Sequence, residues 1–140
     1  MDWQEFDQGV FLVNLLGIVY DPQKKLILIG KRKNDTYIRE LSWSFPGGRP
    51  GYKEDLEHYL KLKIKEKASL DVDVKKIIFA KSYPEKREFL SIYYLCEAAG
   101  GREKAGGKFT EVKWVEPADV QHYFTTSLHP FLLGYLKSLK

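Results

Sequence analysis

The sequence predicts an α+β domain in which one mixed β-sheet lies between helices. Three observations support this fold class: β-rich runs in both halves of the chain, one long helical segment between them, and short helical segments near the C-terminus. One sheet covered by helices is the economical way to bury the apolar sides of such elements. The 140 residues are expected to form a single domain over residues 1–140, because a domain usually holds about 100 to 200 residues.

The first part of the chain is expected to hold three strands. Val10–Tyr20 is rich in Val, Ile and Leu and is followed by an Asp-Pro turn signal, so we expect a strand there. Lys25–Arg32 is its expected hairpin partner. Ser42–Phe45 is a third, short strand that leads into a Pro-Gly-Gly turn.

A helix is expected over Glu54–Ala68, because this segment lacks Pro and Gly and is rich in Leu, Lys and Glu. Leu56, Leu60 and Ile64 recur every four residues, so one stripe of the helix faces a core. At about 100° per residue, Lys67 falls close to that stripe. We therefore expect Lys67 to face a cleft and not to lie on a fully solvated face.

The second half of the chain adds three strands and two short helices. We expect the strands at Val72–Tyr83, Glu88–Glu97 and Glu111–Val115, a Gly-rich loop at 99–107, and helices at 117–120 and 130–139.

Composition and charge narrow the range of functions. The chain has 23 basic and 19 acidic residues, a net charge of +4 and a pI near 9.0. This excess suits a polyanionic small molecule and is too small to favour strong binding to the phosphate backbone of nucleic acid. No apolar run reaches the ~20 residues that cross a bilayer, and the N-terminus lacks the basic start of a signal peptide. The single cysteine, Cys96, excludes an intramolecular disulfide and fits a reducing, cytoplasmic location.

The segment between Trp43 and Val72 carries the residues that point to chemistry. A strand ends, a Gly-Gly turn follows, and a long helix begins a few residues later. Glycine lets a ligand approach backbone groups closely, and a helix N-terminus favours phosphate. This order indicates an anion site beside Gly47, Gly48 and Arg49.

The spacing of these residues resembles the Nudix hydrolase family, whose box reads G-x5-E-x7-R-E-U-x-E-E-x-G-U, where U is a bulky aliphatic residue. Five of the 9 fixed positions match, and they are Gly48, Glu54, Ile64, Glu66 and Leu70. Leu62, Lys63, Lys67 and Ser69 stand where the box has Arg, Glu, Glu and Gly. The likeness extends over most of residues 8–138 and implies a Nudix-like α/β/α sandwich.

The resemblance also implies where a metal would bind. In this family the box helix holds divalent metal, usually Mg²⁺, which neutralises a diphosphate and activates water. The corresponding ligand positions here are Lys63, Glu66, Lys67 and the backbone carbonyl of Gly47. A protonated lysine has no lone pair to offer a metal. We therefore expect the family's usual metal site to be absent.

Three functional hypotheses remain open at this point. In the first, the domain binds a nucleoside-diphosphate-linked or related phosphoanhydride ligand without hydrolysing it, and Lys63 and Lys67 supply the positive charge without a metal. In the second, it is a Mg²⁺-dependent hydrolase of a nucleoside diphosphate derivative with a displaced site built from Glu54, Glu57, Glu66 and Glu111. In the third, it is a non-catalytic module that binds protein or RNA. The resemblance implies a nucleotide-like small molecule as the partner and leaves a homodimer open.

Overall fold

In the computed structural model, residues 9–33, 42–83, 86–125 and 128–139 are described. The strands are β1 (Leu12–Asp21), β2 (Leu26–Arg32), β3 (Trp43–Ser44), β4 (Gly47–Gly48), β5 (Asp71–Tyr83), β6 (Lys86–Gly100) and β7 (Phe109–Val115). The helices are α1 (Leu56–Ala68), α2 (Val120–Tyr123) and α3 (Pro130–Ser138), and a 3₁₀ turn, η2 (Pro117–Asp119), precedes α2.

These strands form one mixed sheet, in the order β3-β2-β1-β6-β5. β1 and β6 run parallel at its centre, from Leu12 opposite Phe89 to Tyr20 opposite Glu97. β2 is antiparallel to β1, and β5 is antiparallel to β6. β4 pairs with β1, and β7 pairs with β2. The predicted mixed sheet is confirmed.

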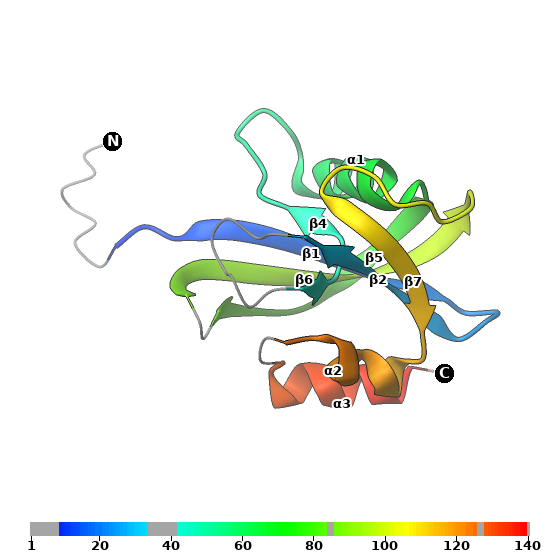
Figure 1. Cartoon of the computed structure of the whole chain (residues 1–140). Coiled ribbons are helices and arrows are strands. Elements are labelled where there is room, and N and C mark those ends of the chain that lie inside the picture. The colour runs from blue at the N-terminus through cyan, green and yellow to red at the C-terminus, as the bar shows by residue number, and fades with distance from the viewer. Residues whose placement is uncertain (1–8, 34–41, 84–85, 126–127, 140) are drawn as a thin grey trace.

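Helices cover both faces of the sheet (Figure 1). The strand β1 contributes side chains to both cores, because successive side chains of a strand point to opposite faces. Leu15 and Val19 pack in one core with residues of α1, whereas Ile18 and Tyr20 pack in a second core with residues of α2 and α3. The predicted stripe of α1 is confirmed at Leu60 and Ile64, which are fully buried, but it was wrong for Leu56, which is exposed in the first turn of the helix. Within the described residues, no helix is long and apolar enough to cross a membrane.

The helix α1 begins at Leu56, two residues later than predicted. Asp55 is its N-cap, and the carboxylate of Asp55 accepts a hydrogen bond from the backbone N–H of His58 at 3.3 Å. A short Asp side chain reaches the unpaired N–H groups of a first helical turn. Glu54 therefore lies before the helix.

The Gly-Gly turn is itself a two-residue strand, which the sequence pattern did not predict. In β4, Gly47 pairs with Leu16 and Gly48 with Leu15. A Cβ atom at Gly47 would overlap the carbonyl oxygen of Leu15, so this close pairing requires glycine. The pairing holds the carbonyl of Gly47 at a defined place beside α1.

The C-terminal end of α1 is held by the chain that follows β6. Ser69, where the family box has glycine, adopts a left-handed backbone with φ of 62°, at a cost of roughly 1 kcal/mol. The backbone N–H of Lys104 donates to the carbonyl of Ala68 at 2.9 Å, and that of Gly106 donates to the carbonyl of Lys67 at 3.0 Å. These bonds place the Gly-rich loop, and Lys108 after it, against the end of α1.

Candidate functional site

A cavity of about 880 Å³ lies between the start of β1, the strand β4 and the helix α1. Further side chains come from the start of β6, from the loop before β7, from the ends of β2 and β3, and from the residues after α2. A volume of this size accommodates a small organic ligand. Both glycines of β4 line it, as the position of the Gly-Gly turn predicted.

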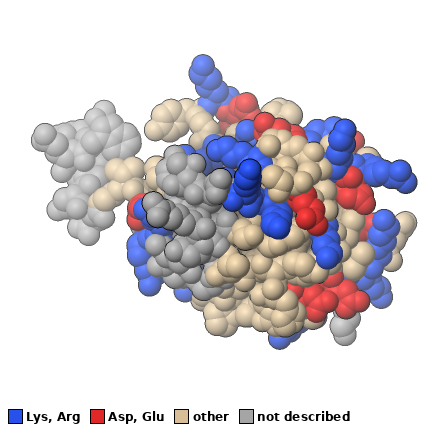
Figure 2. Space-filling view, viewed as in Figure 1, with Lys and Arg blue, Asp and Glu red and all other residues tan. Residues whose placement is uncertain are grey.

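Basic side chains dominate the charge of this cavity. Among the described residues that line it, five are basic and one, Glu66, is acidic; the basic ones are Arg32, Arg49, Lys63, Lys67 and Lys108. The chain as a whole is far more balanced, with 23 basic and 19 acidic residues. The visible face in Figure 2 shows Lys and Arg side chains gathered near its middle. This local excess of positive charge favours an anionic ligand.

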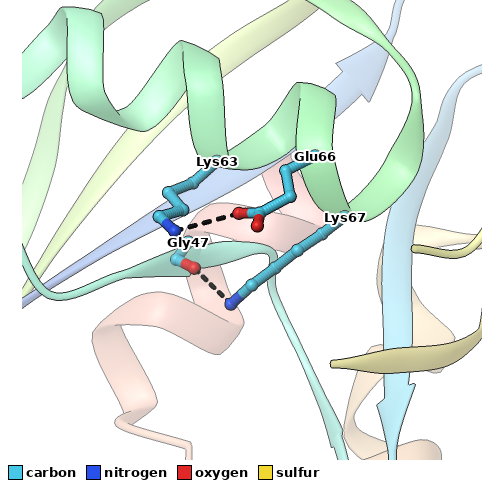
Figure 3. Close-up of polar contacts among 4 residues, drawn as sticks. All are labelled: Gly47, Lys63, Glu66 and Lys67. Atoms are coloured by element: carbon cyan, nitrogen blue, oxygen red, sulfur yellow. Dashed lines mark hydrogen bonds and ion pairs between the residues drawn. The ribbon is translucent and has the colours of Figure 1, made fainter. Parts of the chain in front are cut away.

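Lys67 bridges the helix and the glycine strand. Its Nζ donates a hydrogen bond to the carbonyl oxygen of Gly47 at 2.5 Å (Figure 3) and lies 5.5 Å from the ring centroid of Phe109. Burial, together with the nearby positive charges of Arg32 and Lys63, lowers the pKa of Lys67 to about 8. At neutral pH the amine is still mostly protonated, so Lys67 brings a positive charge into the cavity.

Lys63 and Glu66 form an ion pair one helical turn apart. The Nζ of Lys63 lies 2.9 Å from Oε2 of Glu66 (Figure 3), and this hydrogen bond raises the pKa of Lys63. The side chains are 33% and 51% exposed, so the pair adds only about 0 to 1 kcal/mol to folding stability. The pair matters for the chemistry of the site, because the negative charge of Glu66 is already neutralised by the ammonium group of Lys63 on the same helix.

The structure brings together only part of the predicted site. Gly47, Gly48, Arg49, Lys63, Glu66 and Lys67 all line the cavity. Glu54, Glu57 and Glu111 are exposed and are not among its described lining residues. Glu111 lies on β7, opposite Lys31. A catalytic role for these three glutamates stays a prediction.

Sequence reasoning missed two of the basic residues in the cavity. Arg32 ends β2, and Lys108 follows the Gly-rich loop 76 residues later in the chain. Neither belongs to a local motif that would link it to the helix α1. The one sequence signal for Lys108 is its position directly after Gly106 and Gly107, where the backbone approaches Glu66 closely.

Comparison with models of protein families shows to which family the chain belongs. A family model described as NUDIX domain matches residues 11–134. The chain belongs to the Nudix family. Among curated proteins, none is significantly similar in sequence to this Nudix chain.

Solved structures with the same fold include a NUDIX hydrolase from Nitrosomonas europaea, with a TM-score of 0.70 and 16% identity over 89% of this chain and 70% of that one. A MutT protein from Methanosarcina mazei has a TM-score of 0.70 and 15% identity over 94% of each chain. An ADP-ribose pyrophosphatase from Streptococcus suis has a TM-score of 0.67 and 17% identity over 91% of this chain and 93% of that one. At such identities these likenesses show the Nudix fold and no shared substrate.

The residues at the Nudix ligand positions do not fit a divalent metal. The carbonyl oxygen of Gly47 accepts from Lys67, and the carboxylate of Glu66 is paired with Lys63. Across the described part of the chain, no three His, Cys, Asp or Glu side chains come together as a metal site. Divalent cations such as Mg²⁺ need several oxygen ligands. Two ammonium groups of the chain instead occupy the side-chain positions from which the Nudix pattern would offer carboxylates.

Proposed function

We propose that this Nudix domain binds a nucleoside-diphosphate-linked or related phosphoanhydride ligand without hydrolysing it through the box residues. One observation carries the proposal: the ammonium group of Lys67 donates to the carbonyl of Gly47 inside a cavity lined by further cations. A diphosphate that enters this cavity meets positive charge supplied by the chain itself. No metal is needed to neutralise it.

Charge and burial both support an anionic ligand at this place. Lys67 is half-buried, and Arg32, Lys63 and Lys108 are near enough to affect its pKa. Several like charges near one another repel, so this arrangement costs stability while the cavity holds no anion. A bound diphosphate relieves the repulsion and forms charge-assisted hydrogen bonds to the ammonium groups.

Metal dependence tests the proposal directly. We expect inorganic pyrophosphate, ADP or ADP-ribose to raise the melting temperature equally in Mg²⁺ and in EDTA, with no release of phosphate. A ligand at about 100 times its Kd adds about 2.7 kcal/mol to the free energy of unfolding. For a chain of this length that is a shift of several degrees.

Two variants sharpen the thermal-shift measurement. Lys67→Met should remove most of the shift, because it removes the buried charge. Lys61→Met is the matched control, since Lys61 is an exposed lysine of the same helix that is not among the lining residues. A shift that requires Mg²⁺, or turnover of the ligand in Mg²⁺, would contradict the proposal. So would the lack of any shift with all three compounds.

A rise in pH is expected to weaken binding in proportion to the loss of the Lys67 proton. Burial lowers the pKa of Lys67 to about 8, so the protonated form, which attracts phosphate, is lost as the pH rises through that value. An arginine keeps its charge throughout this range. Calorimetric titration with inorganic pyrophosphate between about pH 6.5 and 9 should show affinity falling in the wild type relative to a Lys67→Arg variant. Parallel pH profiles in the two proteins would contradict this assignment.

A further inference from the structure

One wall of the cavity is apolar, and phosphate binding does not explain it. This apolar wall comes from the segment that leads into β1, the start of β1 and the first half of β6; its residues are Val10, Phe11, Leu12, Val13, Phe89 and Ile92. The first three are 67%, 55% and 40% exposed. Consecutive apolar side chains that remain this exposed at the border of a cavity indicate a contact with an apolar group.

The apolar wall and the cationic residues belong to the same cavity but lie at different positions along β1. Leu16 pairs with Gly47, whose carbonyl accepts the hydrogen bond from Lys67. Leu12 lies four residues earlier on β1, opposite Phe89 of β6. Since a strand rises about 3.3 Å per residue, Leu12 lies roughly 13 Å along β1 from Leu16. Ile92 of the apolar wall lies opposite Leu15, so the wall extends from the neighbourhood of β4 outward.

We infer that the group attached to the diphosphate is an apolar chain, such as an isoprenoid or alkyl group, and not a nucleoside. This inference rests on the proposed function and specifies its ligand. The diphosphate binds at Lys67 and its cationic neighbours, and the chain extends along the start of β1, past Val13 toward Phe11. The hydroxyl groups of a nucleoside's sugar would instead lie against apolar side chains, where they lose their hydrogen bonds to water.

Calorimetry in EDTA with three probes tests the inference: geranyl diphosphate, ADP and inorganic pyrophosphate. We expect geranyl diphosphate to bind at least about tenfold more tightly than pyrophosphate, because each buried methylene strengthens binding by about fourfold. ADP should bind no more tightly than pyrophosphate. The diphosphate group is common to the three probes, so the difference measures the attached group.

Two phenylalanine variants test whether the tighter binding of geranyl diphosphate depends on the apolar wall. Phe11→Ser should weaken geranyl diphosphate binding by about tenfold and leave pyrophosphate binding unchanged. Phe131→Ser is the matched control, because Phe131 is 51% exposed, lies on α3 and is not among the described lining residues. It should change neither affinity.

The possible outcomes separate this inference from the proposed function. If ADP binds more tightly than geranyl diphosphate in EDTA, the inference of an apolar chain is wrong, but binding of a diphosphate without metal is still supported. If none of the three probes binds, the proposed function itself fails. If Phe11→Ser converts a dimer to a monomer in sedimentation and leaves both affinities unchanged, the apolar wall is a contact between copies of the chain, and the inference is overturned.

Discussion

Replacing Lys63 and Lys67 together with glutamate is expected to raise the affinity of the protein for Mn²⁺ by at least about a hundredfold. The double variant frees the carbonyl of Gly47 from Lys67 and the carboxylate of Glu66 from Lys63. Residues three and four apart on a helix share a face, so the three carboxylates would converge beside that carbonyl. Oxygen ligands of this kind hold Mg²⁺ and Mn²⁺.

The size of this effect follows from charge. A unit pair at about 4 Å contributes roughly 4 kcal/mol at an effective dielectric constant of 20. The double variant replaces two repulsions of a dication by two attractions, so a hundredfold gain is a conservative expectation. Titration of free Mn²⁺ followed by electron paramagnetic resonance measures it directly.

The control for the metal experiment is a variant with the same change in charge at two other positions of α1. Lys61 and Lys65 are exposed residues of α1 outside the described lining of the cavity. The Lys61→Glu, Lys65→Glu variant should gain little affinity for Mn²⁺. If this control gains as much as the site variant, or if the wild type already binds Mn²⁺ as tightly, the assignment of Lys63 and Lys67 is wrong.

Replacing Gly47 with alanine is expected to lower the free energy of unfolding by about 3 kcal/mol. The added Cβ would overlap the carbonyl oxygen of Leu15, which is backbone of the central strand β1 and cannot move without breaking the pairing with β4. For a chain of this length, the melting temperature should fall by roughly 10 °C. Thermal unfolding followed by circular dichroism measures the change.

Gly48→Ala is the matched control for this experiment. A Cβ at Gly48 would meet the hydroxyl of Tyr59 at 2.7 Å. That hydroxyl is the end of a long side chain and can turn away, so the cost should stay below about 1 kcal/mol. Equal stability of the two variants would show that the close pairing of Gly47 with β1 does not limit the fold.

The order of the elements could be predicted because each one has a local signature. Alternating or continuous apolar runs indicated the long strands, and the four-residue spacing of Leu60 and Ile64 indicated the buried side of α1. The exceptions lie where tertiary contacts override local preference. The strand β4 has two glycines and no strand propensity of its own, and its pairing with β1 alone makes it a strand.

The sequence by itself determined the family, the position of the glycine turn and the presence of lysines where the Nudix box has glutamates. All three depend on residue type and spacing within one segment. Lys63, Glu66 and Lys67 belong to that local pattern, and the expectation that Lys67 faces a cleft is confirmed by its place in the cavity wall. Only the tertiary structure decided what the charges meet. The bond from Lys67 to Gly47 spans 20 residues, and Arg32 of β2 and Lys108 of the loop before β7 approach the helix from other parts of the fold. Residues so far apart in the chain become neighbours through strand pairing and loop closure, about which local sequence patterns carry no information.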